Sequence, residues 1–590
     1  MTESRSAVRR TLIGAAAVGL FLLPAAAFAA PGQAKKLSPT EAAHDTSQPL
    51  GVLAATLPAR DFSAFMDANG FISFSKPWKS TVEANISAET SGNVTGGNGV
   101  DAALQSFAAP MLGSPIVNFD GASNQDNFNV FGGRVNPPDP VMAVGPNHIV
   151  EMINLVTAIY DKNGNTLVAP FDIGALWAGF AVPDCTDPSG DPIVLYDQFM
   201  DRWVLSQFTT RGLNNPALPF YNCVAVSATS DPTGAYYRYA FTTDDFFPDY
   251  PKYGNWTDSY VITTREFGPN LGYGIGVYAL EKNKMVNGQS ARVIGFRLDA
   301  FNDDGTDGPI PLNLVGDGLL PAYIDGKQKP KTVDTMPIIG TQDDGGGYGA
   351  TFDALNIWDL TVKWNANASA SLTLNTQLPV ASFDSIFPCP GGGRRCLPQP
   401  GAATNQFLDI QSFRQRAIWR LPYRNFKDYD SILAAQSVEA APGVGGMRWY
   451  EVRRVNGAYS LFQQGTYAPL DGVHRWMGSV AQDRQGNIGL GYSVTNATTV
   501  KPGIRFTGRL AGDALGQMTL GEGTIIDGTG IQRSTNNRWG DYTSLNLDPV
   551  DDCTMWYVNE YYTLAGQLSS TAGFNTRIAS FKLPGCFAPK

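Results

Sequence analysis

The sequence predicts an all-β fold, a seven-bladed β-propeller of four-stranded antiparallel blades, preceded by a signal peptide and a flexible leader. From Phe119 onward, short apolar or alternating runs bounded by Gly, Pro, Asn and Asp recur, and amphipathic helices are scarce. A polar start, a strand, a tight turn and a returning strand form one pattern that recurs with variation. Only 16% of residues are charged, while Gly and Tyr are plentiful, as is typical of turn-rich exported β proteins.

The first 29 residues predict a signal peptide. Three arginines precede an apolar run over residues 12–28, and Ala27, Phe28 and Ala29 form a small-residue cleavage site. A membrane anchor is the alternative, because the run is almost long enough to span a bilayer. Pro24 and the cleavage-like tripeptide favour export with cleavage near Ala29, which predicts a secreted or periplasmic protein with no membrane span after cleavage.

Residues 30–115 predict a flexible leader or propeptide, part of which packs on the outside of the core. This region is rich in Ala, Ser, Thr, Asn and Gly, most clearly over residues 91–99. Residues 116–590 are then predicted to form the propeller domain.

The recurring pattern defines the predicted blades. Its seven copies start at residues 139, 191, 251, 341, 409, 475 and 538, and each interval leaves room for two further strands. In the fourth copy the strands are placed at residues 338–341 and 354–358, and in the fifth the returning strand is placed at residues 417–421. One four-stranded sheet cannot bury both faces, whereas sheets stacked around an axis can. Two β-sandwich domains are the alternative, but seven first-strand pairs are hard to fit into them.

Six cysteines in an exported chain favour disulfides over free thiols. Sequence order suggests the local pairs 185–223, 389–396 and 553–586, although six cysteines leave other connectivities open. A zinc site is excluded, because the cysteines form no C-x-x-C pair and have no histidine partners.

Histidine content and charge exclude several functions. Of three histidines, His44 lies in the leader, so a multi-histidine metal site is excluded and a Ser-His-Asp triad would need His148 or His474. No G-x-S-x-G or H-E-x-x-H motif is present. The net charge of −10 and the scattered basic residues indicate that the protein binds no nucleic acid.

Candidate site residues come from the starts of the predicted blades. In a propeller the innermost strands begin at one face beside the axis, so the residues at those starts converge on one mouth. Four of them are candidate catalytic residues: Asp191, Asp409, Asp541 and His474. Seven are candidate ligand-binding residues: Asp139, Tyr253, Trp256, Arg475, Trp476, Arg538 and Trp539. Asp258 belongs to the same predicted mouth.

Each candidate also has a structural interpretation. An aspartate at a strand start often caps neighbouring amides or pairs with an arginine of the next blade. A tryptophan in a propeller often packs between blades, and an arginine beside it can stack on the ring or bridge to a carboxylate.

Two kinds of loop resemble known motifs. Residues 161–165 and 483–487 resemble shortened Asp-box turns, although positive φ at Asn-Gly and Gln-Gly explains them as hairpin turns. Residues 303–308 (DDGTDG) resemble part of a calcium loop and are the place for a structural calcium ion, but the glutamate at the twelfth position of an EF-hand is missing. No other cofactor or metal site is predicted.

The chain resembles exported bacterial proteins described as BNR-like or sialidase-like β-propellers. Five stretches carry the resemblance: 141–150 (VMAVGPNHIV), 191–207, 247–256 (FPDYPKYGNW), 463–477 (QQGTYAPLDGVHRWM) and 538–557 (RWGDYTSLNLDPVDDCTMWY). The likeness covers residues 119–586 and implies one continuous domain. It assigns no activity and no catalytic residue, and true sialidases are a poorer match because complete Asp boxes are absent.

Two hypotheses of function follow. The first is an exported glycoside hydrolase or polysaccharide lyase that acts on a polysaccharide or surface glycan at the axial mouth. Two of the four aspartates 139, 191, 409 and 541 would then be acid and base or nucleophile. In a lyase, His474 with Tyr253 would abstract the proton, and Arg475 or Arg538 would neutralise a uronate.

The second hypothesis is a non-catalytic glycan- or protein-binding module that uses the same mouth, since the fold hosts both kinds of function. The oligomeric state does not follow from the sequence.

Overall fold

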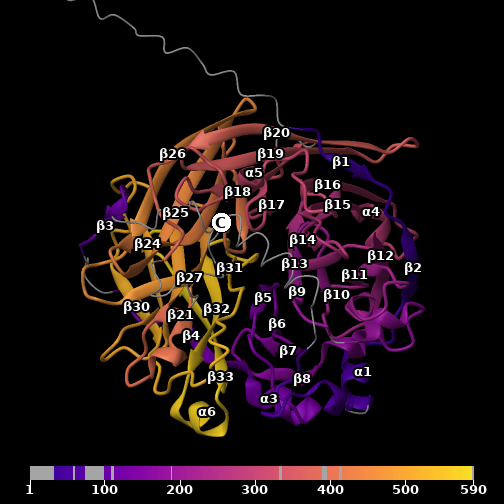
Figure 1. Ribbon diagram of the computed structural model, residues 1–590, viewed down its shortest axis with the longest axis horizontal. Coiled ribbons are helices and arrows are strands. Elements are labelled where there is room, and N and C mark those ends of the chain that lie inside the picture. The colour runs from indigo at the N-terminus through magenta and orange to yellow at the C-terminus, as the bar shows by residue number, and fades with distance from the viewer. Residues whose placement is uncertain are drawn as a thin grey trace, which may run out of the picture.

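A computed structural model describes residues 32–57, 60–73, 99–107, 112–187, 189–330, 335–387, 395–410 and 415–587. The predicted signal peptide, residues 1–29, lies outside the described residues. The described part is mainly β-strand, in antiparallel sheets arranged around a common centre (Figure 1). Its α-helices are short: α1 (Leu50–Thr56), α3 (Asn124–Phe131), α4 (Lys282–Met285), α5 (Leu312–Val315) and α6 (Leu564–Ser569).

Five sheets are separate units, three before and two after a nine-stranded sheet along the chain. The first contains β5 (Val141–Val144), β6 (His148–Met152), β7 (Val156–Asp161) and β8 (Thr166–Asp172). The second contains β9 (Ile193–Asp197), β10 (Arg202–Phe208), β11 (Phe220–Ser227), β12 (Tyr236–Asp244) and the added β2 (Glu41–Thr46). The third contains β13 (Phe247–Asn255), β14 (Ser259–Phe267), β15 (Tyr273–Glu281), β16 (Val293–Phe301) and the added β1 (Lys35–Leu37). The last two contain β27 (His474–Gln482), β28 (Ile488–Thr495), β29 (Gly503–Arg509) and β30 (Glu522–Ile526), then β31 (Ser544–Leu547), β32 (Thr554–Tyr562), β33 (Phe574–Lys582) and β4 (Val117–Ser123).

A nine-stranded sheet lies between the third of these sheets and the one that begins with β27. One half contains β17 (Leu320–Ile324), β18 (Thr335–Gln342), β19 (Ala354–Lys363) and β20 (Ser369–Pro379). The other half contains β23 (Leu421–Asn425), β24 (Asp430–Ala441), β25 (Val444–Val455), β26 (Ala458–Tyr467) and β3 (Leu104–Gln105). The halves join because β17 and β23 pair in parallel.

The first strands of these units form a closed ring. Contacts run in chain order through β5, β9, β13, β17, β23, β27 and β31, and β31 contacts β5 again. In Figure 1 the labelled first strands β5, β9, β13, β17 and β31 lie near the middle, whereas β2, β8, β20 and β26 lie toward the rim. Sheets that stand around an axis in this way form a β-propeller.

A strand that precedes the first sheet completes the last one. β4 pairs antiparallel with β33, with Phe119 opposite Ile578. This pairing joins a strand from before β5 to the last described strand, so the last sheet gains its outer strand from an earlier part of the chain.

Strand burial follows position in the sheet. Every residue of β14 is buried, because this strand lies within a sheet that is covered on both faces. The outer strand β20 has mostly exposed or half-buried residues. Strands within the sheets are accordingly mostly apolar in sequence, and strands at the rim contain more polar residues.

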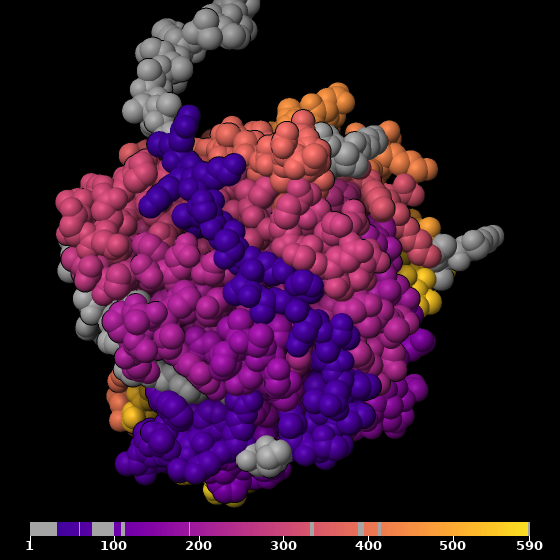
Figure 2. Space-filling model, turned by 90° about the vertical axis from the view of Figure 1, so that its right-hand side faces the viewer, coloured from indigo at the N-terminus to yellow at the C-terminus, as the bar shows by residue number. Residues whose placement is uncertain are grey.

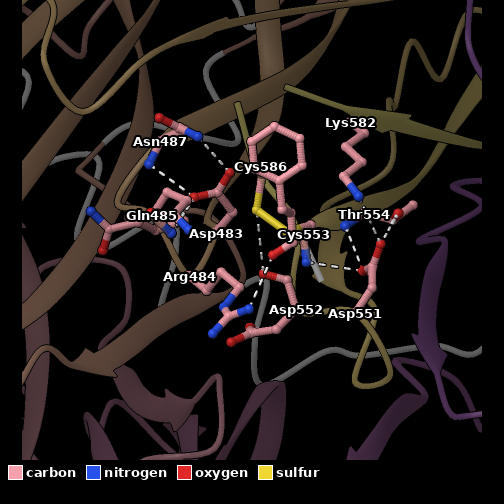
Figure 3. Close-up of a disulfide and its surroundings, with 12 residues drawn as sticks. Asp483, Arg484, Gln485, Asn487, Asp551, Asp552, Cys553, Thr554, Lys582 and Cys586 are labelled. Atoms are coloured by element: carbon pink, nitrogen blue, oxygen red, sulfur yellow. Dashed lines mark hydrogen bonds and ion pairs between the residues drawn. A yellow bond between two sulfur atoms is a disulfide. The ribbon is translucent and has the colours of Figure 1, made fainter. Parts of the chain in front are cut away.

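The Asp-box-like turns are hairpin turns stabilised by one aspartate each. Asp483 Oδ1 accepts hydrogen bonds from the N–H groups of Gln485 and Asn487, at 2.8 and 3.0 Å (Figure 3). Asp161 makes the same two bonds to Asn163 and Asn165. Gly486 and Gly164 both have a φ of 88°. Glycine adopts this positive φ without steric cost, which explains its place in both turns.

Two of the predicted disulfides are confirmed. Cys185 is bonded to Cys223, and Cys553 is bonded to Cys586 near the end of the chain. The second lies beside the 483–487 turn, where the Arg484 N–H donates to the Asp552 carbonyl at 3.0 Å (Figure 3). Cys389 of the third predicted pair lies outside the described residues.

Described parts of the predicted leader lie against the propeller. Figure 2 shows residues 32–57 as an indigo band across the surface of the second and third sheets, where β2 pairs with β12 and β1 pairs with β16. Leu50 of α1 is fully buried. Residues 91–98, the most Gly-rich part of the leader, lie outside the described residues. Among the described residues no helix is long and apolar enough to cross a membrane.

The predicted fourth and fifth copies are wrong by one strand. Residues 338–341 belong to β18, the second strand of its unit, and the first strand is β17. Asp409 ends β22 (Leu408–Asp409), which pairs only with β21 (Arg395–Leu397), and the first strand of the fifth unit is β23. Both missed strands contain a proline, Pro321 in β17 and Pro422 in β23. Proline has no backbone N–H for strand pairing, so a short run that contains one is typical of a loop rather than of an inner strand.

Candidate functional site

Several first strands contain, or are preceded by, a residue in the left-handed backbone conformation. Asp139, two residues before β5, has a φ of 49°, and Asp191, two residues before β9, has a φ of 42°. Tyr250 in β13 has a φ of 54° and Met477 in β27 a φ of 44°, each at an irregularity of strand pairing. An L-residue rarely adopts this conformation, so the ring holds these positions against a local cost of about 1–2 kcal/mol each.

Asn154 links the heads of the first two sheets. Its Nδ2 donates to Asp139 Oδ2 at 2.7 Å, and its Oδ1 accepts from the Asp191 N–H at 3.0 Å. The Asp541 N–H donates to Asp139 Oδ1 at 2.6 Å, which brings the last sheet to the same point. Three aspartates from three sheets therefore meet beside the axis. We call this group, with its neighbours Lys252, Arg416, Arg538, Tyr250, Tyr542 and Glu560, the axial cluster.

Burial and like charge hold Asp139 in its neutral form. The side chain is almost inaccessible, and burial together with the carboxylates of Asp541 and Asp191 raises its pKa to about 8, against an opposing effect of Arg538. Glu560, which accepts the Gly540 N–H at 2.6 Å, is also fully buried, and burial raises its pKa well above the ordinary value. Near neutral pH the cluster thus contains carboxyl groups that retain a proton.

Two arginines accompany Asp541. Arg538 Nη2 lies 2.7 Å from Asp541 Oδ2, and Arg416 Nη1 lies 3.9 Å from the same oxygen. Arg538 also approaches Asp409, with 3.9 Å between Nε and Oδ2. The Arg538 side chain is 23% exposed and that of Asp541 is 11% exposed, so this pair is the part of the cluster that solvent reaches most readily.

Lys252 lies between two tyrosine rings. Its Nζ is 3.1 Å from the Tyr250 ring centroid and 3.4 Å from that of Tyr542. Burial lowers the pKa of this amine well below its ordinary value, and the Asp191 and Asp541 carboxylates oppose that effect. The Tyr542 hydroxyl donates to the Pro251 carbonyl at 3.2 Å and approaches Asp191 Oδ2 at 3.4 Å.

Asp139, Asp191, Asp541, Arg538 and Asp409 are thus the predicted site residues that the ring brings together. Two others from the third sheet lie elsewhere. Tyr253 is buried in the core, and Trp256 packs against Tyr423 with 4.9 Å between ring centroids. Trp256 and Asp258 follow the far end of β13, about 20 Å along the strand from Tyr250.

The sheet that begins with β27 places its predicted residues away from the axis as well. His474 Nδ1 accepts the Gly445 N–H at 3.2 Å, and burial followed by the charge of Arg475 lowers the His474 pKa to about 4. Arg475 binds Glu522 on the outer strand β30 at 2.7 Å. Trp476 and Trp539 are fully buried and pack together with 5.1 Å between ring centroids.

Sequence analysis missed several members of the axial cluster: Asn154, Tyr250, Lys252, Arg416, Tyr542 and Glu560. Tyr250 and Lys252 precede or flank the predicted start at residue 251, and Tyr542 follows Asp541 directly. The sequence pattern therefore indicated the right stretches of chain, but it did not show which residue of each stretch faces the axis. Glu560 and Asn154 lie on or after returning strands and carried no such signal.

One acidic group outside the axial cluster is compact enough to hold a metal ion. Among the described residues, the carboxylates that gather closely enough are those of Asp343, Asp344 and Asp353. Asp343 and Asp353 already accept backbone N–H bonds from Gly345, Ser385, Asp344 and Phe383. In the predicted calcium loop, Asp304 caps the N–H and the hydroxyl of Thr306. Both places are therefore explained as turns.

No protein-family model matches the chain, and no curated protein matches it. Distant likenesses exist among solved structures. An endo-arabinase from Bacteroides thetaiotaomicron is 12% identical over 53% of this chain and 92% of its own, with a TM-score of 0.24. A Penicillium chrysogenum α-L-arabinanase is 10% identical over 58% of this chain and 94% of its own, with a TM-score of 0.27. The Trypanosoma rangeli sialidase is 9% identical over 66% of this chain and 54% of its own, with a TM-score of 0.27. These likenesses are too distant to assign an activity, a substrate or a site residue.

Proposed function

We propose that the chain is an exported seven-bladed propeller that hydrolyses glycosidic bonds of a polysaccharide at the axial cluster. The predicted signal peptide over residues 1–29 and the disulfides support export. The closed ring of first strands supports the blade number.

One observation carries the proposal: a carboxyl group that keeps its proton lies beside an ion-paired carboxylate. Asp139 has a pKa of about 8 and accepts the backbone N–H of Asp541, whose own carboxylate is paired with Arg538. Glycoside hydrolysis needs one acid to protonate the leaving oxygen and one carboxylate to act as base or nucleophile. Two neighbouring carboxyl groups held in different protonation states meet that need.

The residues then take distinct roles. Asp139 donates the proton to the glycosidic oxygen, and Asp541 is the second carboxylate. Asp191 raises the pKa of Asp139 and orders the cluster through Asn154. Arg538, the most exposed charged group of the pair, hydrogen-bonds a sugar hydroxyl or carboxylate. Hydrolysis is favoured over elimination, because His474 and Tyr253 contact other groups in the core.

Purified protein assayed against a panel of polysaccharides tests the proposal. We expect hydrolysis of at least one glycan, with a loss of about 100-fold or more in kcat for Asp139→Asn or Asp541→Asn. Asp120→Asn is the control, because Asp120 is an exposed partner of Arg577 on the propeller surface. The pH profile should lose activity as pH rises past about 8, where Asp139 gives up its proton. Folded protein that hydrolyses no glycan, or folded variants that keep full activity, would overturn the proposal.

Non-catalytic glycan binding is a second candidate, because the low exposure of the axial cluster counts against a reaction at Asp139. Asp139 and Glu560 are almost inaccessible, as is expected of a polar core that only stabilises the ring. Glycan affinity that survives both Asn substitutions, without turnover, would support this candidate.

A further inference from the structure

A hollow of about 450 Å³ lies between the leader and the second sheet. One wall comes from Arg60, Phe62 and Phe65, and the other from Asp187 and the loop that follows β10, including Arg211, Asn214 and Leu218. A volume of this size is in the range of ligand pockets, about 300–1,000 Å³. The axial cluster contributes no residue to it.

Both cations of the hollow are paired with carboxylates. Asp187 bridges the two arginines, with 2.6 Å to Arg211 Nε and 3.5 Å to Arg60 Nη1. Arg60 also binds Asp172 at 3.0 Å, and Arg211 binds Asp184 at 3.0 Å. Because each cation already has carboxylate partners, the hollow has no net attraction for an anion. It instead presents a fixed set of donors and acceptors to a neutral ligand.

The apolar part of the hollow is accessible. Phe65 is 45% exposed and Leu218 is 39% exposed, although large apolar side chains are usually buried. Phe65 is supported by Phe62, at 6.0 Å between ring centroids, and Phe62 packs edge-on against Phe131 at 5.1 Å. An exposed ring beside amide and guanidinium groups suits a ligand with one apolar face and many hydroxyls, which describes a sugar.

The hollow lies at the same end of the second sheet as the axial cluster. Ser206 of β10 pairs with Ile193 of β9, so the loop after β10 lies beside the start of β9, where Asp191 is found. The Ser189 and Thr210 hydroxyls are hydrogen-bonded at 2.9 Å, which fixes this arrangement. Asp187 and Asp191 are four residues apart, so their Cα atoms are at most about 14 Å apart.

We infer that this hollow is a second binding site for a neutral polysaccharide. One part of a polysaccharide molecule occupies the hollow while another part of the same molecule reaches the axial cluster. The inference rests on the proposed function and adds the substrate class, a neutral glycan long enough to occupy both places. Phe65 stacks on a sugar ring, and Asn214 with the Asp187–arginine bridge hydrogen-bonds its hydroxyls.

Affinity gel electrophoresis of the full-length Asp139→Asn variant tests the inference. Gels contain arabinan, xylan or dextran as neutral polysaccharides, or polygalacturonate as the anionic one. We expect retardation by at least one neutral polysaccharide, and a dissociation constant raised roughly threefold to tenfold when Phe65→Ala or Asn214→Ala is added. Phe128→Ala is the matched control, because Phe128 is 46% exposed on α3 and does not line the hollow.

The outcomes separate the two ideas. Retardation that Phe65→Ala and Asn214→Ala leave unchanged, retardation by polygalacturonate alone, or no retardation at all overturns the second site. Retardation that depends on Phe65, in a protein whose unsubstituted form hydrolyses no glycan, supports the second site and overturns axial hydrolysis. For an active enzyme, Phe65→Ala should raise KM for the polysaccharide without lowering kcat, and a fall in kcat alone would contradict the assignment.

Discussion

Asp101 and Arg448 form an ion pair in which neither side chain is exposed, with 2.7 Å between Oδ1 and Nη1. Asp101 belongs to the region read from sequence as a leader, and Arg448 lies on β25. The same arginine donates to the Ala381 carbonyl and to Gln464 Oε1. This part of the leader is therefore held by a buried charge, and its removal would leave a cation in the core.

Asp101→Asn should lower the free energy of unfolding by about 3 kcal/mol, because a buried arginine loses its counter-charge. Chemical denaturation monitored by tryptophan fluorescence measures the change. Asp120→Asn is the control: its pair with Arg577 is 2.8 Å long, but the Asp120 side chain is 60% exposed, so the cost should stay below about 1 kcal/mol. Equal effects of the two substitutions would contradict a structural role for residues 99–107.

The Cys553–Cys586 disulfide should stabilise the closing sheet. It joins residues 33 apart, and loss of a bond of this kind typically costs about 2–4 kcal/mol through the entropy of the unfolded chain. The double variant Cys553→Ser, Cys586→Ser should have a lower Tm than the unsubstituted protein. Reductant should lower the Tm of the unsubstituted protein further than that of the variant, and an equal shift in both would show that this bond contributes little.

Trp476→Phe should reduce stability and leave glycan affinity unchanged. The side chain is fully buried and packs on Trp539 between two sheets, so the smaller ring leaves a cavity that costs about 1–3 kcal/mol. Thermal denaturation and affinity electrophoresis are the two measurements. A variant with an unchanged Tm and a weakened affinity would restore Trp476 as a ligand-binding residue.

Parts of the fold were predictable because local pattern and final position agree. The strands at residues 141–144 and 193–197 are apolar runs preceded by Asp-Pro, and both are first strands in the structure. The sequence did not indicate β17 and β23 because each has a proline at its second position, and these two strands pair with each other in parallel across about one hundred residues. No local pattern reports a pairing partner one hundred residues away.

The candidate site shows the same limit at the level of single residues. β5 and β9 pair with the next strand without a register shift, and Asp139 and Asp191 each lie two residues before the strand, so the sequence pattern indicated both. In β27 the left-handed residue is Met477, and the pairing shifts between Trp476 and Ser479. This irregularity moves His474 and Arg475 away from the axis, and a sequence pattern without the backbone geometry does not reveal it.

The pH dependence of stability should report the proton on Asp139. In the folded protein its pKa is about 8, against an ordinary value of 3.8, so between these values the folded state holds a proton that the unfolded state has lost. Stability from this group is complete below about pH 4 and is lost as pH rises toward 8, with a slope of at most about 1.4 kcal/mol per pH unit. Asp139→Asn removes the dependence. Urea denaturation of both proteins from about pH 5 to about pH 8 should therefore show a difference in unfolding free energy that falls as pH rises.

Asp541→Asn supplies the second check: it removes a negative charge that raises the pKa of Asp139, so the fall should end at a lower pH. A difference that stays constant or rises with pH would mean that Asp139 is ionised in the folded protein and has no proton to donate at neutral pH.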